Sequence, residues 1–111
     1  MAINIMLGLI ILILVLLIAA KYFLSTPVYW FHLNSCPHCV AMEPEWQKFE
    51  SMCMISMIRP IAIESSLPQN QKITQDFGVS AFPTIIKVVN DKPEVYSGQR
   101  TAADIYNWAS S

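Results

Sequence analysis

Two cysteines separated by two residues, Cys36 and Cys39, are the side chains whose type and spacing point most directly to chemistry. They lie between an apolar, β-branched run and a helix-like run. Cys36 is therefore expected at a helix start, where unpaired N–H groups and a partial positive charge stabilise a thiolate. A protonated His38 would add positive charge, and Pro37 suits a first helical turn because its missing N–H removes no hydrogen bond. The pattern predicts a redox-active dithiol, with Cys36 facing water and Cys39 pointing into the fold.

Apolar periodicity and turn residues predict the elements that hold this dithiol. Pro60 cannot donate to a β-ladder, so its strand is expected at a sheet edge. Residues 90–93 have the composition of a turn. Strands are expected at 28–33, 57–63, 84–89 and 94–97, and helices at 36–54, 69–77 and 101–109. This β-α-β-α-β-β-α order predicts an α/β domain with a four-stranded mixed sheet and helices on both faces.

The first twenty residues predict a different kind of segment. The run 3–20 is apolar except for Asn4, and about 18 such residues nearly cross a bilayer. We expect a single transmembrane anchor helix at 1–21, a tether at 22–27 and a folded domain at 28–111. A cleaved signal peptide is the alternative, since Ala19 and Ala20 are small. The absence of Lys or Arg before the run and its length oppose that alternative.

Composition limits the partners that the sequence suggests. The chain has 111 residues, enough for one domain, and 7 Lys and Arg against 8 Asp and Glu. Such a balance gives no reason to expect nucleic acid as a partner. Only Lys21 flanks the apolar run on its C-terminal side, so loop charge does not fix the orientation in a membrane. No cofactor is expected.

Four further segments carry a resemblance to a known family. A proline stands eight residues after Cys36 and is followed by Glu and an aromatic residue, and three other short motifs follow along the chain. The segments are Pro44–Trp46, Gly78–Val79, Phe82–Thr84 and Tyr96–Arg100. With the dithiol, they make residues 28–111 similar to the thioredoxin superfamily, and most similar to the catalytic domains of protein disulfide isomerases. The Cys-Pro-His-Cys sequence itself resembles the dithiol of the bacterial oxidase DsbA.

This resemblance implies a minimal thioredoxin fold that carries out thiol–disulfide exchange. Pro83 would be cis and would turn the backbone of Phe82 toward the sulfurs, where it could pair with a substrate strand. The partners implied are cysteine-containing protein substrates and a redox partner that recycles the dithiol. The DsbA-like motif favours oxidation in an oxidising lumen, periplasm or equivalent compartment, and reduction and isomerisation stay open.

The sequence departs from the family pattern at several positions. Trp30 stands where these enzymes usually bury an acid, and His32 on the same strand face is either a substitute proton relay or simply a partly buried polar residue. Ser35 replaces the usual aromatic before the first cysteine, and either opens the approach to Cys36 or caps the helix. The leading strand and helix of full thioredoxin are replaced by the apolar segment.

Other cysteine and methionine residues have structural interpretations. Cys53 lies 14 residues after Cys39, about 21 Å along a helix, too far for a disulfide, and is expected in the core. Met52, Met54 and Met57 are likewise expected to fill the core.

Two further functions are weighed against the enzyme. Metal binding by Cys36, Cys39 and either His32 or Cys53 lacks a fourth ligand. A structural or adaptor protein within a membrane-associated assembly, for example a virion or a translocation complex, is the alternative function. A Cys36→Ser variant would separate the two, because only a catalytic role is lost with it.

Overall fold

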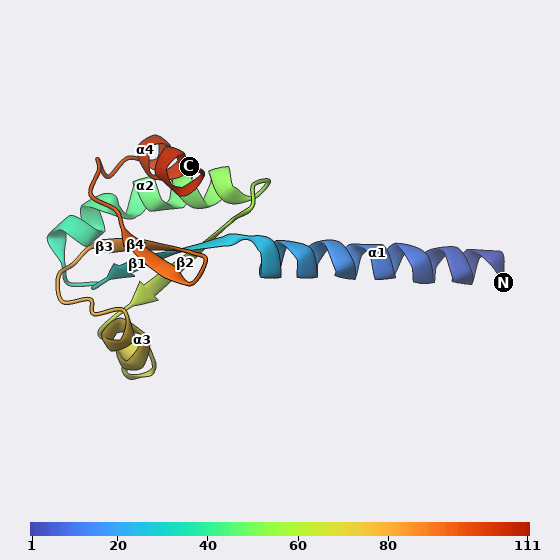
Figure 1. Ribbon diagram of the computed structural model, residues 1–111, viewed down its shortest axis with the longest axis horizontal. Helices are drawn as coiled ribbons and strands as arrows, with labels where there is room; N and C mark the ends of the chain where they lie inside the picture. The colour runs from blue at the N-terminus through green and yellow to red at the C-terminus, as the bar shows by residue number, and fades with distance from the viewer.

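The computed structural model describes residues 1–111 and consists of an extended helix joined to an α/β domain (Figure 1). Along the chain the elements are α1 (Ala2–Leu24), β1 (Thr26–His32), α2 (Pro37–Cys53), β2 (Ile58–Glu64), the 3-10 turn η1 (Pro68–Asn70), α3 (Gln71–Asp76), β3 (Thr84–Val89), β4 (Lys92–Val95) and α4 (Ala102–Ala109).

The sheet has the strand order β2-β1-β3-β4. Strand β1 runs parallel to β2 and antiparallel to β3, and β4 completes a hairpin with β3. The predicted fold class, a minimal thioredoxin fold with a four-stranded mixed sheet, is confirmed. Pro60 lies in the edge strand β2, where its missing N–H can face away from the ladder.

Helices cover both faces of the sheet. Figure 1 shows α2 and α4 on one face and α3 on the other. The larger part of the core lies under α2 and α4 and includes Trp46, Phe49 and Ile105, each at most 1% exposed. A smaller cluster around Phe31 packs against Ile73 and Phe77 on the α3 face. The dithiol helix α2 is therefore fixed by packing along its length.

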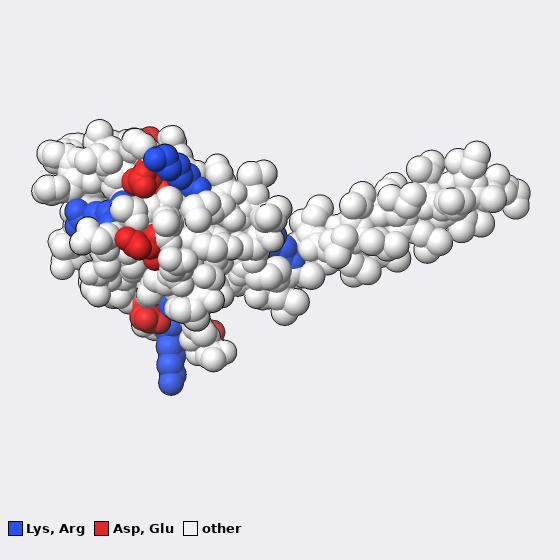
Figure 2. Space-filling model, turned by 90° about the horizontal axis from the view of Figure 1, so that it is seen from above, with Lys and Arg blue, Asp and Glu red and all other residues white.

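Helix α1 projects from the domain and contributes no buried residue. It is the one helix in the structure that is long and apolar enough to cross a membrane by length and composition. Figure 2 shows charged side chains over the domain and an uncharged surface along the visible face of the projecting helix.

The connection between α1 and the domain is shorter than the expected tether at 22–27. The helix continues to Leu24 and β1 begins at Thr26, which leaves only Ser25 between them. The Ser25 N–H donates to Lys21 O at 3.1 Å and so continues the helical hydrogen bonding. Helical hydrogen bonding does not require apolar side chains, so the helix can continue past the end of the apolar run at Ala20.

Two other expectations differ from the structure. The turn expected at 90–93 is confined to Asn90 and Asp91, both with positive φ (53° and 62°), so β4 begins earlier, at Lys92. Two left-handed residues give the tight hairpin turn that Asn and Asp tolerate. The expectation that the methionines fill the core is wrong. Met52 lies on α2 next to the buried Cys53 and is 39% exposed, whereas Met54 and Met57 follow the end of the helix and are 75% and 50% exposed.

Candidate functional site: the dithiol at the start of helix α2

Cys36 caps the N-terminus of α2. Its Sγ accepts a hydrogen bond from the Cys39 N–H at 3.3 Å, and its own N–H donates to Leu33 O at 3.1 Å. Pro37 occupies the first turn of the helix, as the sequence predicts. Cys36 rather than Ser35 therefore supplies the cap. The cap position holds the sulfur at the positive end of the helix, where a thiolate is stabilised.

The loop that precedes β3 lies against the Cys36 sulfur. Cys36 Sγ lies 3.7 Å from Phe82 O, and the peptide bond between Phe82 and Pro83 is cis. The Thr84 hydroxyl donates to Ala81 O at 2.6 Å and closes this tight turn. The structure thus brings together two segments that are 46 residues apart in the chain.

The two sulfurs have opposite environments. Cys36 is half-buried, and hydrogen bonding to the Cys39 thiol is the main cause that lowers its pKa. The N–H groups of Cys39 and His38 and the positive charge of Arg100 lower it further, against burial. Cys39 is 2% exposed, and burial together with its hydrogen bond to Cys36 raises its pKa to about 11. The first sulfur is the one that ionises, and the second is kept as a thiol.

The side chain of His38 is exposed, and its backbone N–H contributes to lowering the pKa of Cys36. Arg100, which lies between β4 and α4, adds a fixed positive charge that lowers the pKa of Cys36 further. In the sequence Arg100 was recognised only as part of a motif, since nothing in its spacing places it near Cys36.

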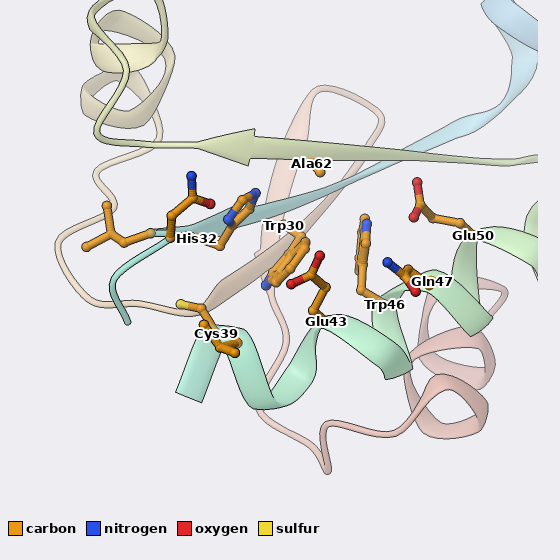
Figure 3. A pocket seen from close by; sticks show the side chains of 11 residues that line it. Trp30, His32, Cys39, Glu43, Trp46, Gln47, Glu50 and Ala62 are labelled. Atoms are coloured by element: carbon orange, nitrogen blue, oxygen red, sulfur yellow. The ribbon is translucent and has the colours of Figure 1, made fainter. Parts of the chain in front are cut away.

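A cavity of about 230 Å³ opens beside the buried sulfur (Figure 3). Figure 3 shows His32, Trp30, Glu43 and Cys39 around this hollow, with Glu43 and Cys39 contributed by α2. The His32 ring stacks on the Trp30 ring with centroids 4.1 Å apart. Burial lowers the pKa of His32 despite the nearby carboxylates of Glu64 and Glu43, which favours a neutral imidazole that can accept a proton. His32 and Cys39 therefore share one cavity.

Glu64 is a site residue that the sequence reasoning missed. It pairs with His32 in the β1–β2 register and is 9% exposed. Its carboxylate accepts the Asn34 N–H at 3.0 Å, the Ser66 N–H at 3.1 Å and the Ser66 hydroxyl. Hydrogen bonding to Ser66, followed by the Asn34 and Ser66 N–H groups, lowers the pKa of Glu64. Glu64 thereby fixes the loop that leads into Cys36.

Cys53 lies in the core at the other end of α2, 1% exposed, as expected. Burial raises the pKa of its thiol to about 11. No group of three or more His, Cys, Asp or Glu side chains is arranged to hold a metal ion.

The four-stranded sheet, the helices on both its faces and the Cys36 and Cys39 pair at the start of α2 together define a thioredoxin-fold domain. Residues 26–111 match the family model described as Thioredoxin, so the chain belongs to the thioredoxin family. It is 34% identical over 77 residues to protein disulfide-isomerase like 2-2 of Arabidopsis thaliana, covering 67% of this chain and 16% of that protein. It is also 34% identical over 82 residues to protein disulfide-isomerase TMX3 of Xenopus laevis, covering 72% and 18%.

Solved structures agree on the fold. The first thioredoxin domain of mouse protein disulfide-isomerase A4 is 25% identical with a TM-score of 0.68, and the similarity covers 78% of this chain and 61% of that one. The J-Trx1 fragment of ERdj5, at 19% identity, gives a TM-score of 0.69 and covers 83% and 45%, a likeness of fold alone. The chain spans less than a fifth of the length of the two curated relatives. The sequence matches show the family of the chain, and the solved structures agree on its fold.

Proposed function

We propose that this protein is a membrane-anchored thiol–disulfide oxidoreductase that forms, reduces or reshuffles disulfides in protein substrates through Cys36 and Cys39. The observation that carries the proposal is the placement of Cys36. Its sulfur caps α2, has a lowered pKa and lies 3.7 Å from Phe82 O, beside Pro83. A stabilised thiolate that is open to solvent on one side and next to exposed backbone is suited to attack, and to be attacked by, another protein's sulfur.

The oxidising direction proceeds in two exchanges. A substrate thiolate attacks Cys36 Sγ of the disulfide form, the bond between the two sulfurs breaks, and Cys39 leaves as a thiolate that takes up a proton. A second substrate thiolate then attacks the substrate sulfur of the mixed disulfide and releases Cys36 as a thiolate. The substrate loses two electrons and two protons, and the dithiol gains the two electrons. A redox partner with a disulfide then restores the oxidised form.

The surrounding residues have distinct roles in this proposal. The backbone at Phe82 and Pro83 pairs with an extended substrate segment and holds its cysteine against Cys36. His32 exchanges a proton with Cys39, because a thiol with a pKa of about 11 needs a base before it can attack a mixed disulfide.

The proposed direction of thiol–disulfide exchange depends on the dithiol site, and the proposed location of the protein depends on α1. A low pKa at Cys36 stabilises the reduced form, which favours passing the disulfide on to a substrate. Helix α1 serves as a single membrane anchor, and the domain lies in an oxidising lumen, periplasm or equivalent compartment. The substrates are cysteine-containing proteins, and nucleic acid has no part in the function.

The test compares the full chain in lipid vesicles with three single variants. Wild type should catalyse both insulin reduction by a thiol and oxidative refolding of a reduced protein, and Cys36→Ser should abolish both. Cys53→Ser is the matched control, since Cys53 is buried at the far end of α2 and should keep full activity. Cys39→Ser should accumulate mixed disulfides. If the activity survives in Cys36→Ser, the proposed enzyme function is refuted and an adaptor role is favoured.

Equilibration with glutathione buffers tests the direction. A reduction potential near about −120 to −180 mV supports an oxidase or isomerase, whereas a value near about −270 mV identifies a reductase.

A further inference from the structure

An ordered turn at the end of α2 exposes apolar side chains that the proposed redox chemistry does not use. This membrane-proximal turn, residues Met54–Met57, places Ile55 at 99% exposure, Met54 at 75% and Met57 at 50%. Hydrogen bonds from the Ser56 N–H and hydroxyl to Cys53 O, both 3.1 Å, fix its conformation. A fixed turn that points its largest apolar residues outward indicates a surface that contacts something apolar.

The membrane-proximal turn is bonded directly to the end of α1. Lys21 Nζ donates to Cys53 O at 2.9 Å and to Met54 O at 3.0 Å, and the Thr26 N–H donates to Met57 O at 2.8 Å. The Lys21 ammonium thereby satisfies carbonyl groups at the C-terminus of α2. Its positive charge is also attracted to the partial negative charge at that end of the helix. These contacts hold the turn at the same height along the α1 axis as Lys21.

A second contact joins α1 to the domain beside that junction. The Arg59 guanidinium of β2 lies over the Tyr22 ring, 4.5 Å from its centroid. With Ser25 the only residue between α1 and β1, the helix and the domain are joined without a flexible linker.

The length of α1 sets the level at which this junction meets a bilayer. From Ala2 to Lys21 the helix rises about 28 Å, close to the hydrocarbon thickness of about 30 Å. Lys21 then lies at the lipid headgroups, and the exposed ring of Tyr22 is of the type that prefers this level. Because Lys21 is bonded to the turn, Ile55 lies at the headgroup level too.

The neighbouring surface of the domain is compatible with lipid. A hollow of about 390 Å³ beside the turn is lined by Met57 and the end of β3, together with the end of α4, and its lining contains no charged side chain. The lining residues are Thr26, Ser56, Met57, Ile58, Val89, Tyr106, Ala109, Ser110 and Ser111.

We propose that the membrane-proximal turn docks into the headgroup region of the bilayer that α1 spans, so that the domain has one fixed orientation on the membrane. This inference rests on the proposed anchoring by α1 and is independent of the redox chemistry. It places the dithiol on the side away from the lipid. Strand β1 runs seven residues, about 20 Å, from the junction toward Cys36.

Depth-dependent quenching in vesicles tests the docking. The full chain with Cys36→Ser and Cys39→Ser carries one fluorophore on Ile55→Cys, Leu67→Cys or Val15→Cys, and the unlabelled background checks that buried Cys53 does not react. Leu67 is the matched control, since it is 41% exposed and follows β2 at the end of the sheet far from α1. Phosphatidylcholine with a nitroxide near the headgroup quenches shallow labels, and one with a nitroxide deep in the chain quenches central labels.

The proposal expects deep quenching at position 15 and shallow quenching at position 55 at least twofold stronger than at position 67. If position 15 is quenched but 55 matches 67, the docking is overturned while the anchor stands. If position 15 is not quenched, both the anchor and the docking are overturned. The insulin assay on the wild-type chain in the same vesicles reports the redox function separately.

A second variant links the quenching to the apolar surface. Ile55→Asp with a label on Met57→Cys should reduce shallow quenching at position 57 to the level of position 67, whereas Leu67→Asp should leave it unchanged. Unchanged quenching with Ile55→Asp would refute a role of the apolar turn.

Discussion

Replacing each active-site cysteine in turn should give two proteins of very different reactivity. Cys39→Ser leaves the half-buried Cys36, and Cys36→Ser leaves Cys39 at 2% exposure. An ordinary thiol of pKa 9.0 is about 1% thiolate at about pH 7, and a thiol of pKa about 11 is about 0.01%. In Cys39→Ser the new hydroxyl can still donate to Cys36 Sγ and the backbone N–H of residue 39 stays in place, so the pKa of Cys36 should remain below the ordinary value and its thiolate should be at least about 100-fold more abundant.

Part of this advantage is lost because a thiolate of lower pKa is a weaker nucleophile. With a Brønsted coefficient of about 0.4–0.5, two pKa units reduce the intrinsic rate by about 10-fold. The net rate of Cys36 should therefore exceed that of Cys39 by at least about 10-fold, and the burial of Cys39 increases the ratio.

The assay is the initial rate of reaction with a small aromatic disulfide at about pH 7, followed by the release of the coloured thiol. Cys53 is present in both variants and 1% exposed, so it contributes equally. Equal rates, or a faster Cys39, would refute the assignment of Cys36 as the nucleophile. Raising the pH toward 9 should narrow the ratio, because the fraction of Cys36 thiolate, with the lower pKa, levels off before that of Cys39.

Three other predictions concern residues other than Cys36. Burial raises the pKa of Cys53 in the folded state to about 11, above the ordinary 9.0. The contribution of the protonated Cys53 thiol to the stability of the fold is therefore complete below pH 9 and is lost as the pH rises toward 11. The difference in unfolding free energy between wild type and Cys53→Ala should therefore fall by about 1 kcal/mol between pH 8 and 10 in urea titrations followed by tryptophan fluorescence, and a constant difference would contradict it. Thr101→Ala removes the cap in which Thr101 Oγ1 accepts from the Asp104 N–H at 3.2 Å, and should cost about 1 kcal/mol in the same titration; no loss would exclude a capping role. His32→Ala should slow the release of mixed disulfides by Cys39. In the wild type, the release rate should drop as the pH falls below 6.5 and through the lowered pKa of His32. A His32→Ala variant that releases mixed disulfides as fast as the wild type would exclude the relay.

Local signals in the sequence were sufficient for most of the fold. Cys36 with Pro37 predicted a helix start and Pro60 predicted an edge strand, and the structure has both of them. Each of these signals depends on a residue type whose backbone chemistry restricts it to a few positions. That is why they could be interpreted without knowledge of tertiary contacts.

Long-range contacts could not be predicted in this way. Arg100 and Glu64 influence the site from other elements, and no spacing in the sequence links either of them to Cys36. The expected core role of the methionines failed for a related reason. Helix α2 ends at Cys53, and Met54 and Met57 lie in the turn that follows, where the carbonyls of Cys53 and Met54 accept hydrogen bonds from Lys21 of α1.

The ultraviolet absorbance of thiolates, titrated against pH in the reduced protein with the oxidised protein as reference, tests the central claim most directly. The account predicts two separate steps, a first thiolate with a midpoint below 9.0 that disappears in Cys36→Ser, and a second near 11 from Cys39. Simultaneous titration of both thiols near 9.0, or a first step that survives Cys36→Ser, would contradict it.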